Sequence, residues 1–488
     1  MMKTAFDNEK YLRTQSEHIR QRIAQFGGKL YLEFGGKLYD DNHASRVLPG
    51  FQPDSKLRML LQMKEQVEIV IAINADDIER NKVRGDLGIT YDRDVVRLIG
   101  IFRDFGLYAS SVVLTRYHNQ PFARAFQSRL ETIGVKVYHH YAIDGYPGNT
   151  AHVVSDEGFG QNEYIETTRE LVVVTAPGPG SGKLATCLSQ LYHEHKRGVK
   201  AGYAKFETFP VWNLSLNNPV NLAYEAATAD LSDVNMIDPY HYEAYGVTTV
   251  NYNRDVAAFP VLVAMFEKIL GQCPYKSPTD MGVNMVGNCI IDADAAREAA
   301  CQEIVRRYYA AMCACKQGKG SEDTVTKLEN LMRKVGVTTE IRRVVKPALE
   351  RENQTDAPAA AMELPDGTIV TAKTSDLLGA SSALLMNALK KLAGMPDEMH
   401  LISPVVLDPI THLKVDHLCN RNPRLHTDET LIALSICAAT NPMAEMAMQQ
   451  LPKLRGCDVH STVILSAVDE NTFKRLGVNL TCEPKYQG

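Results

Sequence analysis

The sequence predicts an α/β protein built on a mostly parallel sheet with helices on both faces. Short apolar runs of strand length alternate with amphipathic helical segments through the first half of the chain. The runs are apolar at consecutive positions, as in strands that are covered on both sides. Glycine and proline stand at the ends of several segments, where helices start and stop. Together these observations favour a P-loop-like or Rossmann-like fold for the N-terminal region.

The elements follow in a regular order. The first clear strand is the apolar run at residues 68–74, and a helix follows at about 91–105. Its apolar residues recur at helical spacing, and Gly106 can end it in the left-handed conformation. A second helix begins at Pro121, a favoured first helical residue. Further strands are predicted at 111–115, 135–141 and 171–175.

The second half of the chain changes character twice. From about residue 255 the pattern turns helical, and a polar stretch at 351–358 is typical of a linker. Beyond it, Leu364-Pro-Asp-Gly367 signals a hairpin turn, and Asn441-Pro442 signals the start of a helix. We therefore predict an α/β domain at 1–254, a helical subdomain at 255–352 and a smaller α/β domain at 353–488.

Composition and charge exclude several classes of protein. Hydrophobic residues make up 45% and charged residues 23%, and the formal net charge is −5. The sequence lacks the basic excess that is typical of nucleic-acid-binding proteins, and it lacks the polybasic run that is typical of proteins that bind anionic membranes. The N-terminal segment lacks the apolar core of a signal peptide, and the apolar run 431–440 is shorter than the ~20 residues that span a bilayer. The ten cysteines lack zinc-finger spacing. We expect a cytoplasmic protein with reduced thiols.

The clearest functional signal is a glycine-rich loop between the strand at 171–175 and an amphipathic helix at 184–196. Its polar and flexible positions are Gly178, Gly180, Ser181, Gly182 and Lys183. In a strand–loop–helix unit, backbone N–H groups and the positive end of the helix dipole point at one place, which favours an anion. Lysine adds a positive charge for a terminal phosphate. We therefore predict a phosphate site at these residues, with Lys183 also acting in catalysis.

The loop departs from the P-loop pattern GxxxxGK[ST] at two positions. Pro177 stands in place of the first glycine, and Leu184 stands where Ser or Thr would bind Mg²⁺. Thr186 lies about 200° further around the helix and cannot replace that ligand. A standard Mg–nucleotide geometry is therefore not expected. The alternative interpretation is a tight strand-to-helix turn whose glycines allow close packing.

A second candidate segment belongs to a local repeat, in which Phe26-Gly-Gly-Lys-Leu-Tyr31 recurs as Phe34-Gly-Gly-Lys-Leu-Tyr39. The repeat indicates two successive turn-plus-strand pieces, with two ligand-binding glycine loops as the alternative. In the loop of the second copy and after it, Lys37 and Arg46 could clamp an anion, and His43 could act as a general acid or base. The structural alternative is a solvated loop whose Asp and Asn residues make turns.

Other candidates stand at the ends of predicted strands. Lys205 and Glu207 end the run 201–207, and the carboxyl ends of parallel strands face the ligand crevice. We predict Glu207 to be catalytic. Asp76 and Asp238 also follow apolar runs and could hold Mg²⁺ with a nucleotide, although strands often end in Asp for structural reasons. The metal and the cofactor are otherwise unknown.

A polar cluster in the last part offers a different chemistry. Its members are Asp408, His412, Asp416, His417, His426, Asp428 and Glu429. If a helix starts near Asp408, His412 and Asp416 share one face at i, i+4, which is a possible spacing for metal ligands. This pattern predicts, as an alternative, a metal-dependent hydrolase. Helix capping and a solvated face are the structural interpretation.

Several strings of the sequence together resemble those of a known family. The segments 31–39, 40–50, 176–183 and 251–255 resemble an uncharacterised bacterial family of similar length, labelled only as a domain of unknown function. The resemblance implies an α/β N-terminal region, a helical insertion and a separate C-terminal α/β subdomain. It implies no activity and no catalytic residues.

The residues themselves lead to a functional expectation. We expect an enzyme that binds a nucleotide or a phosphorylated metabolite, a transferase or hydrolase that acts by phosphoryl transfer or phosphate-ester hydrolysis. A non-catalytic protein that binds and senses such a metabolite is the alternative. The expected partners are a small phosphorylated molecule and further copies of the chain, because most soluble oligomers are symmetric homomers.

Overall fold

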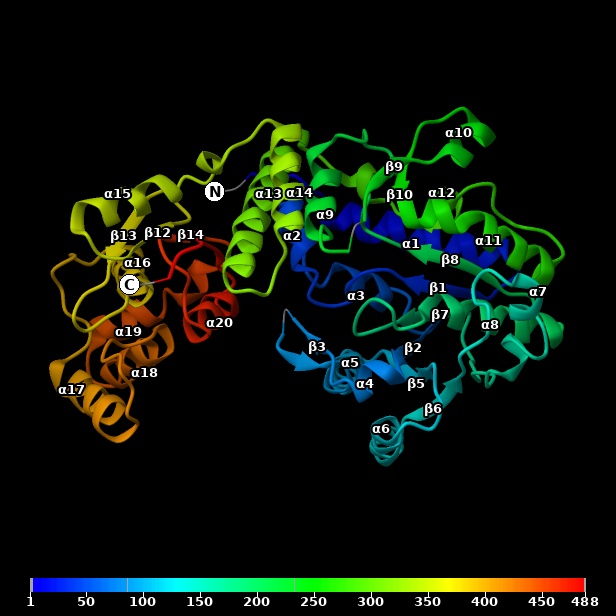
Figure 1. Cartoon of the computed structure of the whole chain (residues 1–488), viewed down its shortest axis with the longest axis horizontal. Coiled ribbons are helices and arrows are strands. Elements are labelled where there is room, and N and C mark those ends of the chain that lie inside the picture. The colour runs from blue at the N-terminus through cyan, green and yellow to red at the C-terminus, as the bar shows by residue number, and fades with distance from the viewer. Residues whose placement is uncertain (1–2, 86, 232, 487–488) are drawn as a thin grey trace. The chain divides into compact units, whose positions relative to one another are not determined.

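The computed structural model describes residues 3–85, 87–231 and 233–486. By internal contacts it divides into two compact units (Figure 1). The first unit is built mainly from residues 4–225 and 233–299, and the second from residues 226–231 and 300–486. Residues 1 and 2, which begin the segment considered above for a signal peptide, lie outside the described residues.

A parallel sheet forms the centre of the first unit. Among the described residues it has seven strands, in the order β11-β8-β1-β7-β2-β5-β6. Every pairing between neighbours is parallel, which confirms the predicted fold class. Figure 1 shows β8, β1 and β7 side by side. The strands are β1 (Leu30–Phe34), β2 (Val67–Asn74), β5 (Tyr108–Thr115), β6 (Lys136–His140), β7 (Leu171–Thr175), β8 (Gly202–Phe206) and β11 (Gly282–Val283).

Helices cover this sheet on both faces. The helices α8 (Lys183–Lys196) and α11 (Asn253–Leu270) pack with Tyr31 of β1 and Val172 of β7 in one buried cluster. Because side chains alternate along a strand, Leu32 points to the opposite face, and it is also fully buried. The predicted helices at 91–105 and from Pro121 correspond to α5 (Tyr91–Asp104) and α6 (Pro121–Thr132).

The two copies of the repeated hexapeptide have different structures. Gly27 and Gly28, with positive φ of 79° and 107°, form the turn that precedes β1. Gly35 and Gly36 follow β1 at the other end of the same strand, and no strand follows them at residues 37–40. The prediction of two turn-plus-strand pieces is therefore right for the first copy and wrong for the second.

The segment 255–352, predicted as a helical subdomain, contributes to both units. In the first unit lie α11, α12 (Pro278–Met281) and the edge strand β11. In the second unit lie α14 (Glu322–Val335) and α15 (Val345–Thr355). The division between the units falls within α13 (Ala293–Lys316). Ser321 caps α14 by accepting a hydrogen bond from the N–H of Thr324.

The second unit contains a smaller, mixed sheet in the order β13-β12-β14-β15. Its strands are β12 (Ala359–Glu363), β13 (Ile369–Lys373), β14 (Asp458–Ser461) and β15 (Asn479–Cys482). The predicted hairpin turn at residues 364–367 joins β12 to β13, and Gly367 has a φ of 84°. Asn441 caps α19 (Pro442–Met448), as the Asn-Pro signal predicts.

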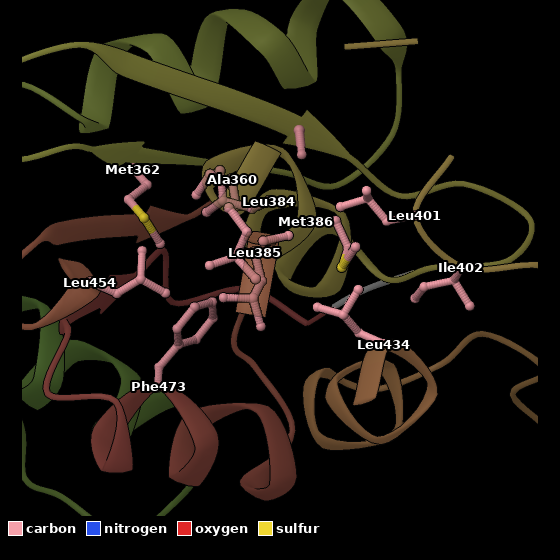
Figure 2. Close-up of a cluster of buried hydrophobic side chains, with 14 of the residues drawn as sticks. Ala360, Met362, Leu384, Leu385, Met386, Leu401, Ile402, Leu434, Leu454 and Phe473 are labelled. Carbon is pink, nitrogen blue, oxygen red and sulfur yellow. The ribbon is translucent and has the colours of Figure 1, made fainter. Parts of the chain in front are cut away.

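The core of this unit is formed by apolar side chains from its helices and β12. Leu384 and Leu385 of α16 (Ala380–Leu392) lie between Met362 of β12 and Leu434 of α18 (Thr427–Ala438) (Figure 2). Phe473 of α20 (Ala467–Arg475) also belongs to this cluster and is fully buried. Within the described part of the chain, no helix has both the length and the apolar character needed to cross a membrane.

Candidate functional site

The candidates of the first unit meet at the carboxyl edge of the parallel sheet. Because the strands all run the same way, the segments that follow them leave the sheet at one edge. β1 lies between β7 and β8. The glycine-rich loop after β7 therefore flanks the end of β1 on one side, and Glu207 after β8 flanks it on the other. The Gly35-Gly36 turn stands between them.

Two hydroxyl groups hold the glycine-rich loop in place. Thr115 Oγ1 donates to the carbonyl oxygen of Ser181 at 2.9 Å, and Ser181 Oγ donates to that of Gly178 at 2.9 Å. Added side chains would not fit, because a Cβ on Gly178 would collide with the Tyr91 hydroxyl. Gly182 has a φ of 85° and packs against Thr115. Close packing thus explains two of the glycines, as the structural alternative expected.

The loop nevertheless leaves its N–H groups open. α8 begins at Lys183, and its N-cap Gly182 offers no side chain to the helix end. Within the described residues, the amides of residues 180–185 donate to no protein acceptor. The next amide, that of Thr186, bonds to the Gly182 carbonyl oxygen at 2.9 Å. Open amides at a helix N-terminus are suited to an anion.

The ammonium group of Lys183 adds a positive charge at this place. The side chain is half-buried, and no hydrogen bond or ion pair joins it to another residue of the described chain. Other lysines near this sheet are engaged, since Lys56 binds Asp41 at 2.7 Å and Lys29 binds Glu194 at 2.5 Å. Thr186 is fully buried.

A cluster of charged side chains lies across β1 from the loop. Lys205 Nζ contacts Asp255 Oδ2 at 2.5 Å and Glu207 Oε1 at 2.7 Å. Glu33 of β1 is the register partner of Lys205 and accepts a hydrogen bond from the Tyr203 hydroxyl at 2.8 Å. Three carboxylates therefore surround one ammonium group. The side chains of Lys205, Glu207 and Asp255 stay 18%, 19% and 21% exposed, so solvent reaches the cluster.

Burial and the excess of carboxylates determine the protonation of this cluster. Burial raises the pKa of Glu207 to about 8, and Asp255 and Glu33 add to the rise while Lys205 opposes it. Burial lowers the pKa of Lys205, but the three carboxylates outweigh that effect and raise it well above its ordinary value. At neutral pH a protonated Glu207 therefore stands beside a charged Lys205.

Two different constraints explain the glycines of the second pair. A Cβ on Gly35 would lie 2.8 Å from the Phe206 carbonyl oxygen and 2.9 Å from Glu207 Cγ. Gly36 has a φ of 69°, and its added Cβ would lie 3.6 Å from Lys56 Nζ. Close approach of β8 therefore accounts for Gly35, and the left-handed backbone accounts for Gly36.

The residues predicted after this turn are placed in different ways. Asp41 caps α2 (Asn42–Val47), and the ring of His43 packs edge-on against Phe209 and Tyr224, with centroid distances of 5.3 and 5.8 Å. Phe209 follows β8 closely, so His43 lies beside the segment that carries Glu207. Lys37 is exposed and Arg46 is half-buried in the last turn of α2. Their binding of an anion stays a prediction.

The two aspartates considered for Mg²⁺ are engaged within the protein. Asp238 is fully buried, caps α10 (Pro239–Tyr245) and accepts a hydrogen bond from Thr279 Oγ1 at 2.6 Å. Both of its carboxylate oxygens accept hydrogen bonds within the protein. Asp76 lies after β2 in the short helix α4 (Ala75–Glu79), where its Oδ2 is 3.6 Å from Arg116 Nε and its Oδ1 accepts a hydrogen bond from Gln120. Among the residues described, no three or more His, Cys, Asp and Glu side chains are grouped to hold a metal.

A surface hollow of the first unit lies away from these candidates. Asp156, Tyr192, Lys196 and Lys268 line it at the C-terminal ends of α8 and α11. A helix that follows a parallel strand runs back along the sheet, so these ends lie at the opposite edge. Lys196 Nζ pairs with Asp156 at 3.2 Å, and the Tyr192 hydroxyl donates to the same carboxylate. The hollow is thus lined by groups that satisfy each other.

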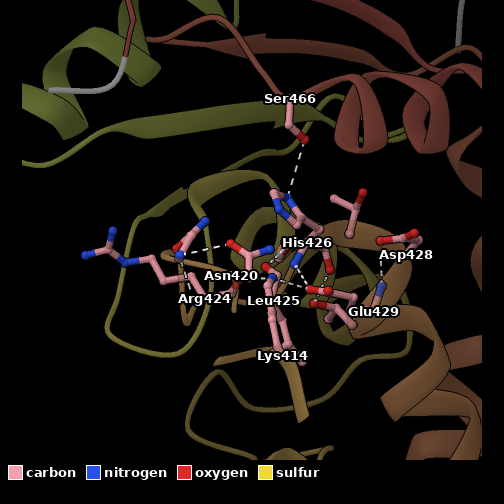
Figure 3. Close-up of polar contacts among 12 residues, drawn as sticks. Lys414, Asn420, Arg424, Leu425, His426, Asp428, Glu429 and Ser466 are labelled. Carbon is pink, nitrogen blue, oxygen red and sulfur yellow. Dashed lines mark hydrogen bonds and ion pairs between the residues drawn. The ribbon is translucent and has the colours of Figure 1, made fainter. Parts of the chain in front are cut away.

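The polar cluster of the second unit serves the ends of helices (Figure 3). His426 is the N-cap of α18 and forms a capping box with Glu429, which also binds Lys414 Nζ at 2.6 Å. His426 Nδ1 contacts Asp469 Oδ2 at 3.0 Å and Ser466 Oγ at 3.4 Å. Both contacts use the same ring nitrogen, whereas a catalytic triad uses both nitrogens. The predicted pair of His412 and Asp416 forms at 2.6 Å on an exposed surface.

Sequence reasoning missed two carboxylates of the first unit. Glu33 is the lone charged residue in a strand whose five positions are all buried. Asp255 stands in the first turn of α11. A single acidic residue near the end of an apolar strand is the available signal for Glu33. Asp255 is the last residue of the segment 251–255, which contributes to the family resemblance but indicates no chemistry.

Comparison with known proteins identifies the family. Residues 4–336 match the family described as "Domain of unknown function DUF1846, N-terminal", and residues 340–488 match its C-terminal counterpart. The chain is 60% identical over 483 residues to the UPF0371 protein cu0538 of Corynebacterium urealyticum, covering 99% of this chain and 97% of that protein. It is 58% identical over 487 residues to a UPF0371 protein of Streptococcus sanguinis, covering 100% and 99%. The chain therefore belongs to the DUF1846 family, which confirms the resemblance to an uncharacterised bacterial family.

Proposed function

We propose that the first unit binds the phosphate group of a small molecule at residues 178–183 and acts in phosphoryl transfer or phosphate-ester hydrolysis. One observation carries this proposal. The open amides of residues 180–185 and the unpaired ammonium group of Lys183 meet at the carboxyl edge of the sheet. Ligands of open α/β sheets bind at that edge.

The charge at this place suits a phosphate monoester. The N-terminus of α8 contributes about half a positive charge, and the Lys183 ammonium contributes a full one. A phosphate dianion needs both, together with several N–H donors. The helix has 14 residues, so its terminus carries the effect of several aligned peptide dipoles.

Glu207 supports a catalytic role for the neighbouring cluster. At neutral pH it carries a proton, because its pKa is raised to about 8. In ester hydrolysis, water attacks phosphorus, the bond from phosphorus to the ester oxygen breaks, and Glu207 gives its proton to that oxygen. The Glu207 carboxylate then accepts a proton from the attacking water. Lys205, at 2.7 Å, stabilises the carboxylate between these two transfers.

Lys183 would act on the phosphate itself. Its ammonium group would hold the phosphate oxygens and offset the charge that develops on them. This role of Lys183 does not require a Mg²⁺ ligand at position 184, where Leu184 cannot bind the ion. It therefore favours a simple phosphate ester over a Mg–nucleoside triphosphate.

The test compares two lysines at opposite ends of one helix. Lys183→Ala and the control Lys196→Ala are measured for binding of inorganic phosphate and for release of phosphate from a panel of phosphate esters. Loss of a charged hydrogen bond should weaken binding by about tenfold to a hundredfold in the first variant only. Equal binding and equal turnover in Lys183→Ala and the unmodified chain would overturn the proposal. Binding that depends on Lys183 without turnover would favour the non-catalytic alternative.

A further inference from the structure

The carboxylate cluster beside the glycine-rich loop bears on the organic part of the ligand. In each of its three acids, one oxygen is used within the protein: Glu33 Oε2 accepts from Tyr203, and Glu207 Oε1 and Asp255 Oδ2 bind Lys205. The second oxygen of each accepts no hydrogen bond from the described chain, and none of the three is sealed from solvent. At neutral pH, Glu33 and Asp255 therefore each present one acceptor oxygen to a ligand, and the protonated Glu207 presents an O–H donor.

Glu33 is the most buried of the three acids. The residue is only 9% exposed, yet its Oε1 has no partner in the described part of the chain. A hydroxyl group of a ligand could replace the water that reaches this oxygen and donate to it. Glu33 is in register with Lys205 on one side and with Val174 on the other. It therefore lies between the other charged residues of the cluster and the strand that leads into the glycine-rich loop.

The charge of the same carboxylate acts on a phenol of the first unit. Tyr146, in the segment after β6, has its pKa raised to about 12 by burial of the hydroxyl group and by the charge of Glu33. The residue is nevertheless 38% exposed. Its hydroxyl group can both donate and accept, so it suits a ligand with hydroxyl groups.

The aromatic rings near Glu207 do not offer a slot for a nucleobase. Phe209 and Tyr224 stack on each other at 5.6 Å, and Tyr252 packs on Tyr224 at 5.4 Å. Lys205 Nζ lies 5.7 Å from the centre of the Tyr252 ring. Phe209 and Tyr252 are 3% and 7% exposed. These rings use their faces within the protein, and a base would have to displace one of them.

We infer that the ligand is a phosphate monoester of a polyhydroxylated compound, that is, a sugar phosphate. Its hydroxyl groups donate to Glu33 Oε1 and Asp255 Oδ1, and its phosphate occupies the glycine-rich loop. This inference rests on the proposed phosphate site and adds the class of substrate. Uncharged hydroxyl groups suit the acids, because the net negative charge of the cluster would repel a second phosphate.

The test separates the two proposals by the choice of ligands. Binding to the unmodified chain is measured by calorimetry for inorganic phosphate, glucose 6-phosphate, ribose 5-phosphate, AMP and cyclohexylmethyl phosphate. The last compound has a ring and a phosphate but no hydroxyl groups. At least one sugar phosphate should bind about tenfold or more tightly than cyclohexylmethyl phosphate, since hydrogen bonds to charged groups are the strong ones.

A variant pair assigns that preference to the cluster. Asp255→Asn should lower the preference for the sugar phosphate about tenfold and leave inorganic phosphate unaffected, whereas the control Asp156→Asn, in the hollow at the opposite edge, should change neither. If Asp255→Asn fails to fold, the comparison of esters on the unmodified chain still decides. Equal affinity for the two kinds of ester, or tighter binding of AMP, would overturn the inference and leave the phosphate site standing. Failure of every phosphate compound to bind would overturn both.

Discussion

Glu33 and Lys205 lie opposite each other as register partners on the adjacent parallel strands β1 and β8. On its other side, Glu33 is in register with Val174 of β7, directly before the strand ends and the glycine-rich loop begins. One residue thus connects the two halves of the candidate site. The arrangement depends on the order of the strands in the sheet, which differs from their order in the sequence: β1 lies between β8 and β7, not beside β2.

The close approach of β1 and β8 at Gly35 gives a first prediction. In Gly35→Ala, the added Cβ would lie 2.8 Å from the Phe206 carbonyl oxygen, so the backbone or Glu207 must shift. Overpacking of this kind should destabilise the first unit by ~1–3 kcal/mol. Urea unfolding followed by the fluorescence of Trp212, the single tryptophan of the chain, measures the change.

Gly100→Ala is the matched control. Gly100 lies within α5, has no positive φ, and its added Cβ would meet nothing within 4 Å. Replacing a helical glycine by alanine should stabilise by up to ~1 kcal/mol. Two variants of equal stability would contradict the steric explanation for Gly35.

The raised pKa of Glu207 predicts a specific dependence of stability on pH. The folded chain keeps a proton on Glu207 up to a pKa of about 8, whereas the unfolded chain releases it near the ordinary value of 4.5. Between these values the folded state binds more protons, so this group lowers stability as the pH rises. Glu207→Gln cannot ionise and escapes the loss. Its free energy of unfolding relative to the unmodified chain should therefore increase from pH 5 to pH 8, as urea titrations at each pH would measure. A difference that stays constant with pH would rule out the shift.

Much of the fold could be predicted because local patterns determine it. The strands at 171–175 and 68–74 are continuous apolar runs, and β7 and β2 lie where those runs lie. The order of the strands could not be predicted, because it depends on contacts between distant segments. The second copy of the repeated hexapeptide shows the limit most directly. Its sequence repeats that of the first, but its glycines follow β1 instead of preceding a strand, and Gly35 packs against Glu207.

The candidate site was predictable only in part for the same reason. The loop around Lys183 has a local signature, and Glu207 follows a strand-like run. Glu33 and Asp255 join Glu207 only because β1 and the start of α11 lie beside β8. Similarly, Ser466 and Asp469 contact His426 although they lie 40 and 43 residues further along the chain. His426, which the sequence left open as part of a metal site or of a helix cap, is the N-cap of α18, and Ser466 is the N-cap of α20.

The core of the second unit provides a prediction of stability alone. Phe473 is fully buried among leucine side chains from several helices, as Figure 2 shows. Phe473→Ala should destabilise the second unit by ~3–5 kcal/mol, because it removes the ring and leaves a cavity. Hydrogen exchange of the amides in β14 and α16 would show the loss. Val405→Ala, at a residue that is 80% exposed, should change stability by no more than ~0.5 kcal/mol.

His140 predicts sensitivity of the first unit to acid. Its ring is buried at the end of β6, and Nε2 donates to the carbonyl oxygen of Glu163 at 3.2 Å. Burial lowers its pKa to about 3, against an ordinary value of 6.5. Between these values the unfolded chain binds a proton that the folded chain excludes, so stability falls as the pH drops. For one proton the slope is about 1.4 kcal/mol per pH unit.

The variant His140→Gln isolates this effect, because glutamine can keep the N–H donor to Glu163 but cannot take up a proton. Its stability relative to the unmodified chain should rise as the pH falls from 6 to 4, followed by Trp212 fluorescence. His412→Gln offers a control of opposite sign. A hydrogen bond with Asp416 raises the pKa of His412, so the contribution of that pair is present in acid and lost as the pH rises above 6.5. Parallel pH profiles for His140→Gln and the unmodified chain would show that the folded protein accepts a proton on His140, against the buried, neutral ring described here.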